Sequence, residues 1–371
     1  MVSLSLQSIA SLANKYSIEP QDAAERVASF FISMGCDKVY DINLARHLAL
    51  IESYREFKSH KEQIKDDNHP LISSICPGWI CYAEKTNGEL IIPHLSKVRS
   101  PQQIMGALIK QQAVRESKKK SDVYHVSLMP CFDKKLEASR QEFKDEDTGV
   151  SDVDCVLTPV ELEDILKDEG VYLLDFDRRK LDIIVETGLR FDQPLTNHFG
   201  SVSGGYAENI LLAYMCQELD ENSKKNIQYT TLRNNDFIEI TMKNPDGNAD
   251  IPGNSQIARF AIINGFRNIQ TVVQRLKRGA LKYDYIEIMA CPSGCINGGA
   301  QCRPDDPSSQ SASRSEEVYK QVPNVDLNLQ LNDVNMSIYE KLNLKDEKQL
   351  IQMIYTTFRP VPKMQNVNVS W

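Results

Sequence analysis

Three segments of the chain end on a cysteine after a short apolar run, and this arrangement constrains the fold more than any other feature. Cys76 follows LISSI, Cys131 follows HVSLMP, and Cys291 follows YIEIMA. Short apolar runs of this kind are typical of parallel strands that are buried on both faces of a sheet. Ligands of such sheets bind outside the carboxyl ends of the strands, so these cysteines can converge although more than 200 residues separate the first from the last.

A fourth cysteine lies close to the third. Cys291 and Cys295 are separated by three residues that include Pro292 and Gly294, and this spacing favours a sharp turn that aims two thiolates at one centre. Four thiolates suit either a zinc ion or a [4Fe-4S] cluster. The spacing alone leaves both metals open.

The remaining cysteines are expected to be ordinary residues rather than ligands or disulfide partners. The chain has nine cysteines, an odd number, and its first 20 residues do not read as a secretory signal. A disulfide framework is therefore not expected, and the cytoplasm is the default compartment. Five cysteines match no ligand position, with the last of them the best candidate for a spare thiol near the site: Cys36, Cys81, Cys155, Cys216 and Cys302.

Composition excludes several classes of protein. Hydrophobic residues make up 41% and charged residues 25% of the chain, which is close to the average of globular proteins. No apolar run approaches the roughly 18 residues that cross a bilayer, so no membrane span is expected. The net charge of −8 disfavours general binding to nucleic acid or to an anionic membrane surface.

The pattern along the chain predicts an α/β fold. Apolar positions after Pro20 predict an amphipathic helix over 20–34, and a short strand is expected over 36–42. Ser100 and Thr158 each precede a proline and are expected to cap a helix. Alternating helices and strands predict parallel sheets flanked by helices.

Three regions are expected along the chain. A first α/β lobe is predicted over 1–125, and a second lobe with the return to the cysteine site over 126–300. A loop, a helix and a flexible tail are predicted over 301–371. The two lobes are not expected to fold separately. Polar stretches at 243–254 and 303–316 are predicted to be surface loops or linkers.

The three cysteine segments together resemble the three signature motifs of the catalytic domain of iron-only hydrogenases. The motifs are Cys76-Pro-Gly-Trp79, Met129-Pro-Cys131 with Lys134-Lys135, and the stretch from Met289 through Cys295 to Gly299. Stretches such as CPGWICYAEKT and MPCFDKKLEASR resemble most closely the nuclear prelamin A recognition factor-like family, which works in cytosolic iron-sulfur protein assembly. The resemblance covers nearly the whole chain.

The resemblance implies a cofactor and its ligands. Cys76, Cys131, Cys291 and Cys295 are expected to ligate one [4Fe-4S] cluster, buried between the lobes of an iron-only hydrogenase catalytic-domain-like fold. The turn Ser203-Gly-Gly205 resembles one that packs near the cluster in hydrogenases. A second cluster is expected only in a longer form, because the N-terminal cluster segment of the family is missing from this sequence. Bulky apolar neighbours of the cysteines are expected to exclude solvent: Ile75, Pro77, Trp79, Pro130, Phe132 and Pro292.

Two departures from the hydrogenase pattern argue against an enzyme. Ile75 stands where hydrogenases carry a second cysteine that relays protons, and Ser53 stands where an acidic residue of the same relay is expected. Lys134 matches a lysine that contacts a di-iron ligand in hydrogenases, and is expected here to be a surface or lobe-bridging charge. A hydrogenase-type enzyme is the disfavoured alternative. A cluster-free nuclear interaction protein, in which the cysteines pack or bind zinc, is the other.

The implied role is that of a non-catalytic cytosolic assembly component. It would link early cluster synthesis to the late targeting complex that serves cytosolic and nuclear apoproteins. The expected location is the cytoplasm, with the nucleus as a second compartment. Val369-Ser-Trp371 loosely fits a C-terminal tripeptide read by the targeting complex with its WD40-repeat subunit, so Trp371 is the expected partner contact.

Overall fold

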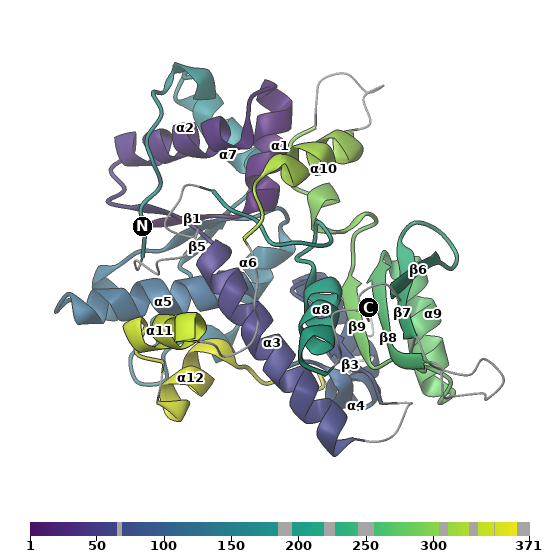
Figure 1. The fold of residues 1–371 in the computed structure, drawn as a ribbon. Coiled ribbons are helices and arrows are strands. Elements are labelled where there is room, and N and C mark those ends of the chain that lie inside the picture. The colour runs from purple at the N-terminus through teal and green to yellow at the C-terminus, as the bar shows by residue number, and fades with distance from the viewer. Residues whose placement is uncertain are drawn as a thin grey trace, which may run out of the picture.

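The computed structural model describes residues 1–64, 69–184, 195–218, 227–243, 256–303, 311–325, 333–344 and 346–361. Two sheets stand side by side, each with helices on its faces, and the long helix α3 runs between them (Figure 1). The predicted α/β class with two lobes is confirmed. None of the described helices is long and apolar enough to cross a membrane.

The first sheet has four parallel strands in the order β2-β1-β4-β5. Its strands are β1 (Val2–Leu4), β2 (Val39–Asp41), β4 (Val126–Leu128) and β5 (Cys155–Leu157). Helices α1 (Leu6–Tyr16), α2 (Pro20–Ser33), α7 (Pro159–Asp168) and α10 (Ser311–Gln321) pack together beside one face. The helix predicted over 20–34 and the strand predicted over 36–42 are confirmed as α2 and β2.

The second sheet has five strands in the order β3-β9-β8-β7-β6. They are β3 (Leu71–Ser73), β6 (Ile227–Thr231), β7 (Phe237–Lys243), β8 (Gln256–Asn264) and β9 (Tyr285–Met289). β3, β9 and β8 are parallel as predicted, but β7 and β6 run antiparallel to their neighbours. The prediction of parallel sheets therefore holds for β3, β9 and β8 but not for this edge of the second sheet.

The remaining helices complete the layers. They are α3 (Asn43–Gln63), α4 (Pro77–Ile91), α5 (Pro101–Arg115), α6 (Asp133–Ala138), α8 (Tyr206–Glu218), α9 (Phe266–Lys277), α11 (Asp333–Lys341) and α12 (Glu347–Ile354). Thr158 caps α7 as predicted, because its hydroxyl accepts from the amide of Glu161 and the Glu161 carboxylate accepts from the amide of Thr158. Ser100 precedes α5 as predicted, but its side chain makes no capping bond.

The predicted regions do not follow the sheets. β3 lies within 1–125 but pairs with β9, whereas β4 lies within 126–300 but pairs with β1. The chain passes from one sheet to the other and back. Neighbouring parallel strands need a crossover connection, so they do not have to be consecutive in the sequence. The described residues of region 301–371 form three helices rather than one, and residues 362–371 lie outside the described structure.

The predicted loops are corrected in part. Most of 243–254 lies outside the described residues, and Lys243 ends β7. The stretch 303–316 was expected to be a loop throughout, but α10 begins at Ser311. Tyr319 and Val322, at and just after the end of this helix, pack into the core of the first lobe, and this burial overrides the polar start of the segment.

Helix α3 joins the lobes through buried polar side chains. The Arg46 guanidinium donates from Nε to the carbonyl of Gly204 (3.3 Å), and from Nη1 to Oδ1 of Asn197 (3.1 Å) and the hydroxyl of Tyr319 (2.8 Å). Near the middle of the helix, the carboxylate of Glu52 accepts from the Tyr355 hydroxyl at 2.6 Å. These bonds fix α3 to α10, to the loop that precedes α8 and to the residue that follows α12.

A buried carboxyl group connects β9 with the start of α8. Glu287 is fully buried, and its carboxylate accepts from the amide of Ala207 (2.9 Å) and the hydroxyl of Ser201 (3.3 Å). Burial raises the pKa of Glu287 to about 7, and nearby Glu208 adds to the rise. The charged form is therefore disfavoured in the native protein.

We predict that Glu287→Gln removes a loss of stability that the wild-type protein suffers as the pH rises. The native state holds the Glu287 proton up to about pH 7, whereas the unfolded chain releases it near the usual value of 4.5. The unfolding free energy of the variant minus that of the wild type should therefore increase by on the order of 2 kcal/mol from pH 5 to pH 8. Urea unfolding at both pH values measures this, and a pH-independent difference would contradict it.

Candidate metal centre

Cys76 lies at the carboxyl end of β3 and is the N-cap residue of α4. Its amide donates to the hydroxyl of Ser74 (3.1 Å), and its Sγ accepts from the amide of Ala290 at 3.5 Å. Ala290 directly follows β9 and precedes Cys291. The first and third cysteine motifs are thus adjacent, as parallel pairing of β3 with β9 requires.

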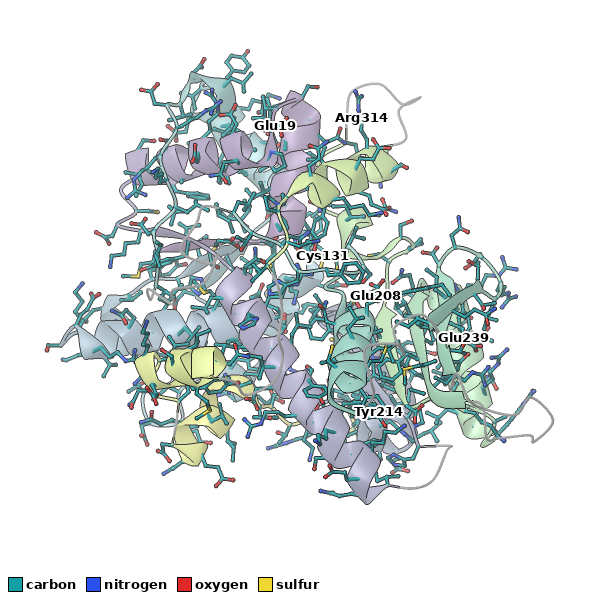
Figure 2. The ribbon with its side chains drawn as sticks, in the orientation of Figure 1. Glu19, Cys131, Glu208, Tyr214, Glu239 and Arg314 are labelled. Atoms are coloured by element: carbon teal, nitrogen blue, oxygen red, sulfur yellow. The ribbon has the colours of Figure 1, made fainter. Side chains whose placement is uncertain are left out.

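Cys131 comes from the other sheet. It follows β4 and precedes α6, and Figure 2 places it in the region between the two sheets. Cys291 and Cys295 follow β9, with Cys295 in the short 3-10 helix Gly294–Asn297. The four cysteines predicted as ligands therefore lie beyond the carboxyl ends of strands from both sheets, where the sequence placed the candidate site.

The four thiols affect one another electrostatically, so they are neighbours in space. Burial raises the pKa of Cys295 well above its usual value, and the thiols of Cys76, Cys131 and Cys291 raise it further. Burial likewise raises the pKa of Cys131 to about 12 and that of Cys291 to about 11, with Cys76 contributing to both. Four adjacent sulfur atoms that disfavour negative charge need a cationic centre to exist as thiolates.

The chemistry of the donors limits what the four thiols could hold. Among the described residues, no group of three or more His, Cys, Asp or Glu side chains is placed to hold one metal ion. A tetrahedral zinc site draws four sulfur atoms to within about 2.3 Å of one point. A [4Fe-4S] cluster instead places a separate iron at each of four thiolates. Four thiols match the ligand set of either centre.

A network of hydrogen bonds shapes the loop that carries Cys295. The Cys295 amide donates to the hydroxyl of Ser203 at 3.0 Å, which confirms that the turn Ser203–Gly205 supports the site. The side-chain amide of Gln301 donates to the carbonyls of Gln7 (2.8 Å) and Cys295 (3.5 Å). Motif spacing did not identify Gln301, because its partners lie in α1 and in the loop itself.

A small cavity of about 40 Å³ lies beside Cys295 and includes Ile75, Met129 and Lys134 in its lining. This volume accommodates only a few water molecules. Lys134 is buried and its ammonium donates to Glu137 at 2.7 Å, so it is neither the surface charge nor the lobe bridge expected from the sequence. Ile75 and Lys134 thus both line the space next to Cys295.

The site is shielded on one side and open on the other. Trp79 is completely buried, as expected of a residue that excludes solvent. Phe132, however, is 49% exposed, Pro292 is exposed, and Cys131 and Cys291 are partly exposed. The prediction that all bulky neighbours cover the site is therefore wrong at the edge where the chain leaves β4 and β9.

Comparisons with known proteins agree with this architecture. Residues 1–299 match the family described as "Iron only hydrogenase large subunit, C-terminal domain". The chain is 39% identical over 376 residues to "Cytosolic Fe-S cluster assembly factor narfl" of Xenopus tropicalis, covering 100% of this chain and 76% of the relative. It is 44% identical over 326 residues to "Cytosolic iron-sulfur assembly component 3" of Pongo abelii, covering 87% of this chain and 66% of the relative.

Solved hydrogenase structures share the fold. The C377H variant of apo [FeFe]-hydrogenase HydA1 from Chlamydomonas reinhardtii has a TM-score of 0.78 to this chain and is 23% identical to it. The match covers 97% of this chain and 93% of the hydrogenase chain. The predicted iron-only hydrogenase catalytic-domain-like fold is confirmed. An identity this low carries no information on activity.

We predict that Gly294→Ala destabilises the protein more than Gly279→Ala does. Both glycines have positive φ, 74° and 61°, so both substitutions incur backbone strain. Only at Gly294 would the new Cβ collide with another group, the hydroxyl of Ser203 at 1.9 Å, whereas nothing lies within 4 Å at Gly279. The excess loss of unfolding free energy should be about 2 kcal/mol, as measured by urea unfolding.

The collision itself can be tested by removing the opposing side chain. Adding Ser203→Gly to Gly294→Ala leaves the backbone strain but removes the hydroxyl, and should recover part of the lost stability. If Gly294→Ala and Gly279→Ala are equally stable, the close packing of the Cys295 loop on Ser203 is contradicted.

Proposed function

The chain belongs to the iron-only hydrogenase-like family of cytosolic iron-sulfur cluster assembly factors, and on this premise we propose that it is a non-catalytic component of cytosolic iron-sulfur protein assembly. It would bind one [4Fe-4S] cluster and link early cluster synthesis to the late complex that targets clusters to cytosolic and nuclear apoproteins. Its place of action would be the cytosol, with the nucleus as a second compartment. The names of the relatives support the cytosolic assembly role.

The observation that carries the proposal is the convergence of four thiols from three strand ends. Cys76, Cys131, Cys291 and Cys295 would hold the cluster, which when bound supplies iron and sulfide that can be retained or handed on. Ser203 and Gln301 would hold the loop of the fourth ligand through its amide and carbonyl. Because the ligands come from both sheets, the binding free energy would also stabilise the junction of the lobes.

Hydrogenase activity is not proposed, for two reasons. Ile75, beside Cys295, and Ser53, in helix α3, stand where the resemblance expects groups of a proton relay, and the aliphatic side chain of Ile75 has no proton to exchange. The relatives are named as assembly factors rather than as enzymes.

We predict that Cys131→Ala and Cys291→Ala each abolish most of the bound iron and lower the melting temperature of the whole protein. Each substitution removes one of four ligands, and the remaining three cannot complete the cluster. Iron content and visible absorption after anaerobic purification measure the first effect, and thermal unfolding measures the second. Cys155→Ala is the control, because Cys155 lies within β5 of the first sheet and should not change the iron content.

The outcome separates the proposal from its alternatives. Full iron content in either ligand variant would remove that cysteine from the site. Zinc without iron in the wild-type protein would favour the cluster-free interaction protein. Hydrogen evolution, with infrared bands of carbonyl and cyanide ligands, would favour the hydrogenase.

We further propose that Trp371 binds the targeting complex through its WD40-repeat subunit; this residue lies outside the described structure. A terminal indole with its carboxylate is a compact anchor that fills a pocket at low entropic cost. Deleting Trp371 should weaken binding at least tenfold, which corresponds to about 1.4 kcal/mol, without changing iron content. Calorimetric titration measures the affinity, and equal affinity of both chains would remove the tail from the mechanism.

A further inference from the structure

The C-terminal segment Tyr355–Val361, which we call the strap, is fixed to the connection between α4 and α5. The Thr356 amide donates to the carbonyl of Lys97 (2.8 Å), and the Arg99 amide donates to the carbonyl of Ile354 (2.7 Å). Nε of Arg99 donates to the carbonyl of Tyr355 at 2.9 Å. In Figure 1 the yellow chain leaves α12 and continues towards α4. The strap is thus bound by its backbone and not only by side-chain packing.

Farther along, the strap is bound to helix α4. The carboxylate of Glu84 accepts from the amide of Arg359 (3.3 Å), and the carbonyl of Glu84 accepts from the amide of Val361 (3.0 Å). Gly88 faces Pro360 so closely that a Cβ at Gly88 would lie 2.8 Å from the proline ring. The helix to which the strap is bound is the one whose N-cap residue is Cys76.

The same carboxylate connects the strap to the second ligand segment. Arg140, which follows α6, donates to both oxygens of Glu84, at 2.9 and 2.7 Å. Its guanidinium also lies 6.0 Å from the centre of the Phe358 ring. Cys131 lies at the start of the α6 segment, so Glu84 and Phe358 contact the elements that carry two different ligands.

The strap also closes the back of the Cys76 motif. Thr356 and Phe358 line a cavity of only about 30 Å³ together with Ile75 and Cys76. Phe358 packs against the apolar cluster that contains Cys76 and Trp79. A shift of the Cys76 segment would therefore move the residues against which the strap packs.

We propose that the strap is a clamp whose docking and the occupancy of the cysteine site stabilise each other. A cluster would fix the starts of α4 and α6 relative to one another, and this is the arrangement in which Glu84, Arg140 and Phe358 hold the strap. Coupling between two sites is reciprocal, so a docked strap raises the affinity for the cluster by the same factor by which the cluster favours docking. The chain continues from Val361 to Trp371, so a partner of the tail would distinguish loaded from unloaded protein.

The clamp rests on the proposed cluster, and its test begins with the full wild-type chain. After measurement of iron content, hydrogen exchange of the Thr356 and Val361 amides is compared in the loaded and the iron-depleted protein. Exchange is expected to be at least tenfold slower in the loaded protein. Amides of β1 and β4 serve as a reference for global unfolding. Equal protection of the strap in both states would overturn the clamp.

A variant supplies a second measurement that does not require the unloaded protein to stay folded. Phe358→Ala should accelerate iron loss to a chelator about tenfold, with four irons per chain bound at the start. Phe176→Ala is the matched control, because Phe176 is also a half-buried phenylalanine but packs edge to face on Phe30 in the first lobe. Equal rates of iron loss in Phe358→Ala and wild type would overturn the clamp.

The two proposals fail in different ways. If the wild-type chain binds no iron, both the proposed function and the clamp are overturned. If it binds iron at the four cysteines but neither the exchange of the strap nor the rate of iron loss responds as stated, only the clamp is overturned.

Discussion

Four thiols, partly withdrawn from water, lie at the junction of the two sheets. Burial raises the pKa of each of these cysteines, so without a cation they would remain protonated and would contribute only weak packing. A metal centre would convert the same four groups into strong bonds between β3, β4 and β9. Helix α4, helix α6 and the Cys295 loop each follow one of these strands, so their positions are set where the three strand ends meet.

Local features of the fold could be predicted from the sequence because the signals for them are local. Pro20 and Thr158 mark the starts of α2 and α7, and the three cysteine segments identify the strands that end at the site. The pairing of β3 with β9 could not be predicted, because nothing within either strand specifies a partner more than 200 residues away. The ion pair of Lys134 with Glu137 and the exposure of Phe132 likewise depend on neighbours from other elements.

The fold alone does not decide between chemistry and assembly. The hydrogenase structures and this chain share an architecture at 23% identity, whereas the relatives at 39% and 44% identity are named as assembly factors. Near Cys295, the departure from the hydrogenase pattern that the resemblance identifies is Ile75, which lines the small cavity beside that cysteine. A substitution of this kind can leave the packing of the lobes intact, which is how one scaffold can serve different purposes.

The interleaving of the two sheets sets the order of events during synthesis. The first sheet is complete once β5 has emerged at residue 157, but β3 must wait for β9 at residues 285–289 before it has its parallel neighbour. The last two cysteines, at 291 and 295, emerge only after that. A nascent chain therefore cannot build the complete cysteine site until residue 295 has been made. Loading of the proposed centre would then come only after all the strands of both sheets have been synthesised.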